Sequence, residues 1–173
     1  MLITTSRRTN HRSRLLGREL AMVIPGAKYL PRGKKPVRKL ASLSSPLASS
    51  LVIVITSQKD QPHELRFLDT SSGWRWLDAK IELSKVVLQR DLGNKIKFHD
   101  LKLATDGSRR AKEFADFIAG VTKLPLAEGA GGPVGLVKNE EGLRLQFQEE
   151  IDRDVVGPVL HISSYGRLYG EAY

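Results

Sequence analysis

The spacing of hydrophobic residues along the chain predicts two amphipathic helices. In each of them, apolar side chains recur every three or four residues and would share the face that is turned to a core. These residues are Leu16, Leu20, Val23 and Ile24 in the first helix, and Ala111, Phe114, Ala115 and Ile118 in the second. Thr9 or Asn10 can cap the start of the first helix, and Asp106 or Ser108 the start of the second, because their side-chain oxygens accept hydrogen bonds from free backbone N–H groups.

Shorter hydrophobic runs predict strands. Residues 51–55 form a continuous run rich in β-branched side chains, which is typical of a buried, parallel strand. Single strands are also expected at residues 2–5 and 159–162, and a short helix at residues 37–47, which Pro36 would begin. Three hairpins are predicted from pairs of runs that flank turn sequences. They join residues 64–68 to 74–77, residues 85–89 to 95–103, and residues 134–138 to 143–148.

Two stretches of the chain align without gaps at a spacing of 94 residues. Residues 18–31 and 112–125 share six identical pairs in fourteen, and each stretch follows a short apolar segment that ends in threonine. Each also contains a glycine, Gly26 or Gly120, that we expect to end its helix, because glycine readily adopts the left-handed conformation found there. We therefore predict an α/β fold, with a mixed α+β sheet, that is built from two duplicated halves.

The net positive charge of the chain comes from its first half. The chain has 173 residues, a formal net charge of +9 and an isoelectric point near 9.9. Residues 1–80 hold 15 basic and 5 acidic residues, whereas residues 81–173 hold 13 basic and 14 acidic residues. Like charges repel one another in a folded protein, so a cluster of one sign favours polyanion binding over a solvated face. We place the boundary between a basic N-terminal half and a near-neutral C-terminal half close to residues 80–84.

Eleven basic residues form the candidate nucleic-acid-binding surface. Some follow the first predicted strand and continue along the first helix, and the others lie in a loop with prolines and a glycine and at the start of the next helix. Arginine and lysine would bind phosphates, which positions a protein on RNA with little choice of sequence. The candidates are Arg7, Arg8, Arg12, Arg14, Arg18, Lys28, Arg32, Lys34, Lys35, Arg38 and Lys39.

Other chemistries find little support in the sequence. Cysteine is absent, which excludes thiolate catalysis, disulfides and cysteine-containing metal sites. The glycines of residues 129–132 lack the spacing of a nucleotide-binding loop, and no hydrophobic run is long enough to span a membrane. We expect a solvated acidic edge, and no metal or cofactor, at a group of acids without a histidine at ligand spacing. This group is Glu140, Glu141, Glu149, Glu150, Asp152 and Asp154.

The two tryptophans, Trp74 and Trp76, are two residues apart and would lie on one face of a strand, with Arg75 between them. Tryptophan beside arginine can stack on RNA bases. Aromatic residues make up only 6% of this chain, however, so we expect both rings to be needed in the core.

The N-terminal residues resemble the opening of the Brix domain. The likeness is closest to the U3 small nucleolar ribonucleoprotein subfamily and its short archaeal relatives. The chain starts almost at the domain, which favours the archaeal form. The likeness continues more weakly through residues 51–56 to Val156-Gly157-Pro158. The residues that carry it most specifically are Ile3-Thr4-Thr5-Ser6-Arg7, Ser13-Arg14-Leu15, Glu19-Leu20, Ile24-Pro25-Gly26 and Arg32-Gly33.

This resemblance implies a fold of two copies of an aminoacyl-tRNA synthetase anticodon-binding domain. It also implies a non-enzymatic, RNA-binding factor of ribosome biogenesis that acts in pre-rRNA processing. We further expect this factor to work by clamping or remodelling RNA through the basic surface of the first half. Its partners would be precursor ribosomal RNA, with a small guide RNA as a further candidate, and ribosome-assembly proteins, in the cytoplasm of an archaeon or the nucleolus of a eukaryote. The family's motif extends RNA binding to Arg7, Arg14 and Arg32, whereas charge clustering alone suggests the other cations.

Two other classes of function stay open at this point. An RNA-directed, metal-dependent nuclease would need a set of acidic ligands that the sequence does not display. A protein scaffold, or a protein of anionic membranes, would use the basic half without direct RNA binding.

Overall fold

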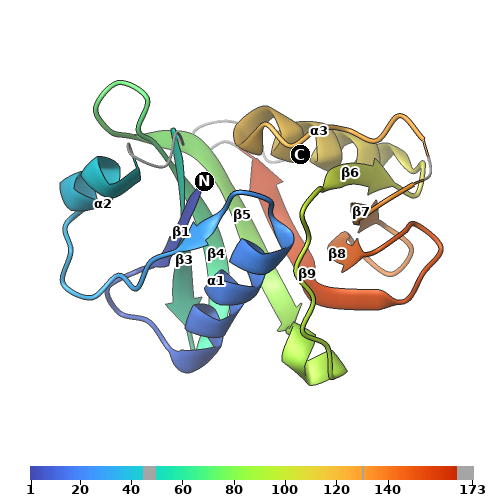
Figure 1. The fold of residues 1–173 in the computed structure, drawn as a ribbon, viewed down its shortest axis with the longest axis horizontal. Coiled ribbons are helices and arrows are strands. Elements are labelled where there is room, and N and C mark those ends of the chain that lie inside the picture. The colour runs from blue at the N-terminus through green and yellow to red at the C-terminus, as the bar shows by residue number, and fades with distance from the viewer. Residues whose placement is uncertain (45–49, 130, 167–173) are drawn as a thin grey trace.

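The computed structural model describes residues 1–44, 50–129 and 131–166 (Figure 1). It confirms the expected mixed α/β architecture, because the strands of this part of the chain form one nine-stranded mixed sheet in the order β2-β1-β3-β4-β5-β9-β8-β7-β6. The elements are β1 (Leu2–Thr5), α1 (His11–Val23), β2 (Lys28–Tyr29), α2 (Val37–Ser44), β3 (Leu51–Gln58), β4 (Gln61–Asp69), β5 (Arg75–Val87), the 3-10 helix η2 (Gln89–Leu92), β6 (Lys102–Thr105), α3 (Arg109–Thr122), β7 (Val134–Lys138), β8 (Arg144–Gln148) and β9 (Val155–Gly166).

The two sides of the sheet have the same order of pairings. On one side, β1 pairs in parallel with β3, and β4 and β5 follow in antiparallel order. On the other side, β6 pairs in parallel with β7, and β8 and β9 follow in antiparallel order. The last strands of the two sets, β5 and β9, pair with each other and join the sheet. The predicted boundary at residues 80–84 falls inside β5, and the origin of the halves by duplication stays a prediction.

The two aligned stretches end their helices differently. Asn10 caps α1 by accepting a hydrogen bond from the Ser13 backbone N–H at 2.7 Å. The helix ends at Val23, because Pro25 disfavours helical geometry at Ile24, which is extended instead (φ −97°, ψ 111°). In α3, which Ser108 caps, nothing interrupts the chain at the same place, so Gly120 lies inside the helix and the expectation that it stops the helix was wrong.

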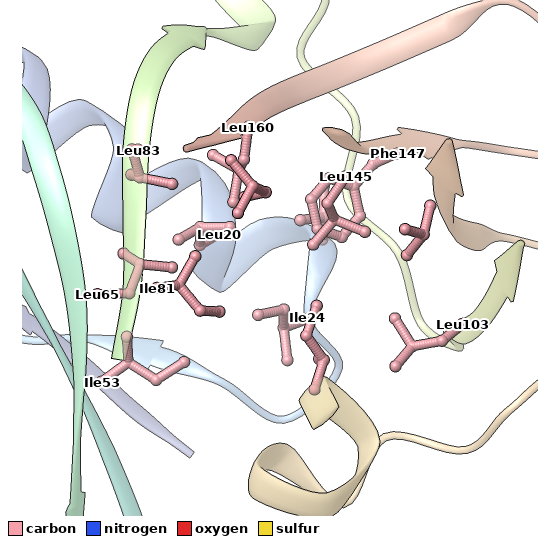
Figure 2. Close-up of a cluster of buried hydrophobic side chains, with 14 of the residues drawn as sticks. Leu20, Ile24, Ile53, Leu65, Ile81, Leu83, Leu103, Leu145, Phe147 and Leu160 are labelled. Carbon is pink, nitrogen blue, oxygen red and sulfur yellow. The ribbon is translucent and has the colours of Figure 1, made fainter. Parts of the chain in front are cut away.

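Helices α1 and α3 pack on the same face of the sheet and share one core. All the residues predicted to face inward from the two helices are buried there. Figure 2 shows how the side chains from the two sides of the sheet meet, where Leu20 of α1 and Ile24, which follows the helix, share one cluster with Ile81 of β5 and Leu145 of β8. The shorter helix α2 covers the opposite face, where Leu40 packs among side chains of β1, β3 and β4. The predicted helix at 37–47 is thus confirmed to Ser44, and residues 45–47 lie outside the described residues.

The second predicted hairpin, which joined residues 85–89 to 95–103, was wrong. Residues 85–87 end β5, η2 follows, and only residues 102–105 form the strand β6. The Gln89 side chain takes the place of a partner strand, because it donates to the Ile96 carbonyl and accepts from the Ile96 N–H. Its amide also donates to the Gly157 carbonyl, which fixes the segment after η2 against β9.

The first and third predicted hairpins are confirmed. The strands of the first are longer than the hydrophobic runs, whereas β7 and β8 match the predicted ranges to within one residue. β3 continues to Gln58 and turns into β4 through Lys59 and Asp60, both with positive φ angles (46° and 60°). This turn conformation usually selects asparagine or glycine, so the sequence gives no sign of it. The predicted strand at residues 159–162 is the middle of β9, which has 12 residues.

A buried carboxylate fixes α1 to the segment that crosses between the two sides of the sheet. Glu19 is only 7% exposed, and its carboxylate accepts hydrogen bonds from the backbone N–H groups of Gln89 (2.6 Å) and Arg90 (3.5 Å). Burial raises the pKa of Glu19 above its ordinary value, while these two hydrogen bonds act in the opposite direction. Glu19 therefore caps the start of η2 from a different element.

We expect Glu19→Ala to lower the free energy of unfolding by about 1–3 kcal/mol, because it leaves buried backbone N–H groups without a partner. Urea unfolding measures this change. Glu113→Ala is the matched control, since Glu113 occupies the aligned position of α3 but is exposed and pairs with Arg109 at 2.7 Å. Its expected loss is below about 0.5 kcal/mol. Equal losses in the two variants would contradict the role given to Glu19.

Candidate nucleic-acid interface

Three parallel strands end at one edge of the sheet, and basic residues follow each of them. β1 pairs in parallel with both β2 and β3, so the carboxyl ends of the three strands lie at the same edge. Arg7 and Arg8 follow β1, Lys34 and Lys35 follow β2, and Lys59 follows β3. Helix α1 also begins here. We call Arg7, Arg8, Arg14, Lys34, Lys35 and Lys59 the basic edge, and none of these six has an acidic partner within 4 Å among the described residues.

A hollow of about 270 Å³ lies in the basic edge, between the loop that enters α1 and the turn after β3. Arg8 and Lys59 bring two cations to it, and Asp60 brings one carboxylate. The remaining lining is polar and comes from Thr9, Asn10 and Ser57. The sequence analysis missed Lys59, because nothing in the sequence indicated that β3 extends beyond residue 55 and turns at this edge.

Helix α1 carries its cations close to the edge strand β2. Gly17 makes the close approach possible, because a Cβ atom at this position would lie 2.7 Å from Cε2 of Tyr29. The guanidinium of Arg18 lies 5.7 Å from the centre of the Tyr29 ring. Burial raises the pKa of Tyr29, and the charges of Arg18 and Arg14 act in the opposite direction. Arg14 and Arg18 thus share an exposed helix face that continues from the basic edge.

Two of the predicted cations have internal partners. Arg12 pairs with Asp91 at 2.8 Å and donates to the Val86 carbonyl at 3.2 Å, so it connects α1 to the end of β5 and to η2. Arg32 is 7% exposed, and its Nε donates to the Lys35 carbonyl at 2.8 Å, which closes the loop after β2. Burial lowers the pKa of Arg32, and nearby Arg7 lowers it further. Arg12 and Arg32 therefore stabilise the backbone from which the neighbouring cations extend.

The remaining predicted cations lie outside the basic edge. Lys28 is at the start of β2, where its backbone N–H donates to the Met1 carbonyl, and therefore at the opposite edge of the sheet. Arg38 and Lys39 are exposed on α2, over the face of the sheet opposite to α1. The structure therefore places five of the eleven candidates in the basic edge and the other six elsewhere.

Acidic side chains offer no metal centre in residues 1–44, 50–129 and 131–166. No group of three or more histidine, aspartate or glutamate side chains in this part of the chain could hold an ion. Glu140 lies within 3.6 Å of Lys138 and Arg144, and Glu150 lies 3.4 Å from Arg153. These acids are thus engaged by neighbouring cations. In the same ranges, every helix is too short or too polar to cross a bilayer.

The expectation that both tryptophans are core residues was wrong. Trp74 is 50% exposed and Trp76 is 37% exposed. In β5, Leu77, Ala79 and Ile81 face the core shared with α1 and α3. Side chains alternate between the two faces of a strand, so Trp76 points away from this core, to the opposite face of the sheet. Buried phenylalanines fill the shared core instead.

We expect Arg12→Gln to raise the pKa of Asp91 towards its ordinary value of 3.8, without restoring it fully. The pKa is lowered first by the hydrogen bond from the Leu88 N–H and then by Arg12, and only the second is lost. A lowered carboxyl pKa gives stability that is present above pH 3.8 and is lost as the pH falls through the folded-state value.

The wild type should therefore lose more stability than Arg12→Gln when the solution is acidified through this range. Carboxyl NMR titration and acid unfolding measure the two effects. Arg75→Gln is the control, because Arg75 pairs with Asp69 at 3.0 Å and not with Asp91. An unchanged Asp91 titration in Arg12→Gln would show that the ion pair is absent in solution.

Comparison with known proteins gives the chain archaeal relatives, although no family model matches it. A probable Brix domain-containing ribosomal biogenesis protein of Pyrococcus horikoshii is 35% identical over 96 residues, which are 55% of this chain and 42% of that protein. A protein of the same description from Methanopyrus kandleri is 30% identical over 132 residues, which are 72% of this chain and 69% of that protein. The matched part thus spans less than half of the Pyrococcus relative and about two thirds of the Methanopyrus relative.

Solved structures show the same fold at low sequence identity. The crystal structure of a probable ribosomal biogenesis protein from Aeropyrum pernix superposes with a TM-score of 0.82 at 22% identity, and covers 99% of this chain and 98% of that chain. The archaeal Imp4-like protein Mil superposes with a TM-score of 0.71 at 18% identity, over 96% and 99% of the two chains.

Proposed function

This chain belongs to the Brix domain-containing ribosomal biogenesis proteins, and we propose from this membership that it binds precursor ribosomal RNA during ribosome assembly. The observation that carries the RNA-binding part is the basic edge, where six cations without acidic partners among the described residues gather at the ends of three parallel strands. The protein would work as a binding factor and not as an enzyme. Its place would be the cytoplasm of an archaeal cell, as expected for relatives of archaeal origin.

Phosphate groups fit the basic edge better than other anionic ligands. The cations lie on three separate loops and one helix, so they present several separated charges rather than a single pocket. A polymer with regularly spaced negative charges can engage all of them at once. If all six contact phosphates, the logarithm of the affinity should fall with the logarithm of the salt concentration with a slope of roughly −4 to −5.

In this proposal, protein partners would bind the side of the sheet that residues 81–173 form. Residues 81–173 have nearly balanced charge, and the acids near β8 are paired with neighbouring cations. Such a surface neither attracts nor repels RNA strongly. Assembly proteins could therefore dock there while RNA occupies the basic edge.

We expect the variant Arg7→Gln, Arg8→Gln, Arg14→Gln to bind a structured ribosomal RNA fragment more weakly and with a salt slope that is smaller by about 2 to 3. A salt titration of binding measures both changes. The control variant Arg110→Gln, Lys112→Gln, Lys123→Gln removes the same charge from exposed positions on and next to α3. We expect it to keep the wild-type slope.

Two results would contradict the proposal. Equal losses in the two triple variants would mean that net charge, and not the basic edge, attracts RNA. Wild-type binding by both would mean that the basic edge does not face RNA at all.

A further inference from the structure

The only two tryptophans of the chain, Trp74 and Trp76, are exposed, and Trp76 lies on the sheet face that α2 covers in part. The position of Trp76 follows from one row of paired residues across the sheet. Leu2 of β1 pairs with Val52 of β3, Val52 pairs with Leu68 of β4, and Leu68 pairs with Trp76 of β5. The first three side chains are buried in one cluster with Leu40 of α2. Trp76 is the first member of this row that α2 does not cover.

The surroundings of Trp76 are polar and already paired. The guanidinium of Arg66 lies 5.1 Å from the centre of the Trp76 ring and 3.6 Å from the Glu64 carboxylate. On β5, Lys80 pairs with Glu82. Among the described residues, the other large exposed hydrophobic side chains are Leu92 and Leu126, which belong to η2 and to the segment before β7. Neither of these two belongs to β4, β5 or α2, the elements around Trp76.

This setting favours a flat aromatic ligand over a protein partner. The centre of a protein interface is usually a contiguous apolar patch. In the described parts of β4, β5 and α2, no large hydrophobic side chain except Trp76 is strongly exposed. Unpaired nucleic-acid bases need only an aromatic ring and are tolerant of polar surroundings, because every base has a flat face. An arginine beside the ring adds a second stacking partner.

Cations connect the basic edge to the tryptophans along α2. The helix begins two residues after Lys35, and its far end is tied to the turn before Trp74 by a 2.8 Å hydrogen bond between the hydroxyls of Ser44 and Thr70. Arg38 and Lys39 are exposed on it and have no acidic partner within 4 Å in the described part of the chain. Eight helical residues span about 12 Å. A short single strand could thus follow α2 from one edge of the sheet to the other.

We infer that Trp74 and Trp76 stack on unpaired bases of the RNA whose phosphates contact the basic edge. The inference rests on the proposed function and makes it more specific, because it requires a single-stranded segment next to the phosphate-binding surface. Arg38 and Lys39 would contact the phosphates between the two.

Tryptophan fluorescence tests the inference directly, because Trp74 and Trp76 are the only tryptophans of the chain. Excitation on the long-wavelength side of the absorption band, where tyrosine does not absorb, selects their emission. We expect a single-stranded RNA oligonucleotide to quench the emission. An abasic oligonucleotide with the same number of phosphates should bind with a similar salt slope and leave the emission unchanged. This pair of measurements uses the unmodified protein, so it does not depend on how a variant folds.

A variant series gives the second arm of the test. We expect the double variant Trp74→Leu, Trp76→Leu to bind the RNA oligonucleotide about 5- to 140-fold more weakly per stacked ring, and the abasic oligonucleotide as tightly as wild type does. Leu126→Ala is the matched control, because it removes a similarly exposed apolar side chain (44%) elsewhere and should bind both as wild type does.

The outcomes separate the inference from the proposed function. Unchanged emission and unchanged RNA affinity of the tryptophan variant, together with weaker binding by the Arg7, Arg8 and Arg14 variant, would overturn the inference alone and assign the tryptophans to a protein partner. Quenching without any effect of the arginine variant would support stacking and overturn the proposal that the basic edge binds RNA. Neither quenching nor an arginine effect would overturn both.

Discussion

The buried carboxylate of Glu19 holds the first helix in the position on which the other features depend. It binds the backbone of η2, and α1 makes further contacts on either side of Glu19. Towards the N-terminus, Arg12 pairs with Asp91, and Gly17 allows Tyr29 of β2 to approach. Towards the C-terminus, the Met22 carbonyl accepts a hydrogen bond from the Phe98 N–H. Because these contacts involve both sides of the sheet, they also fix the direction in which Arg14 and Arg18 point.

The cations of the first half have different roles that depend on their partners. Arg12 and Arg32 have internal partners, and their charges stabilise the folded backbone. Arg7, Arg8 and Lys59 have no such partners among the described residues, and their charges are available to a ligand. The two groups depend on each other, since the loop that Arg32 closes is the loop that presents Lys34 and Lys35. A high net charge alone cannot distinguish the two groups, because the distinction lies in tertiary contacts.

Local pattern predicted the elements whose structure is set locally. The helix faces of α1 and α3, their caps at Asn10 and Ser108 and the hairpin between β7 and β8 all follow from spacing and turn residues. The failures have a common cause in distant contacts. The Gln89 side chain replaced a strand that alternation had favoured, and α2 covered Leu68 but not its neighbour Trp76. At Gly120 the missing signal was a proline, because the proline before Gly26 ends α1 and α3 has alanine at that place.

The pairing of β5 with β9 limits how this protein could act on RNA. The two strands join the sides of the sheet through a ladder of paired residues that runs from Lys80 to Val87. A hinge between the two sides would have to break these backbone hydrogen bonds, and the shared core beneath them would be opened to water. Closure of the two sides around RNA, which would be needed for the clamping that we expected from the sequence, is therefore unfavourable. Under the proposed function, the sheet would keep its shape on binding, and the RNA would change its shape to fit the protein.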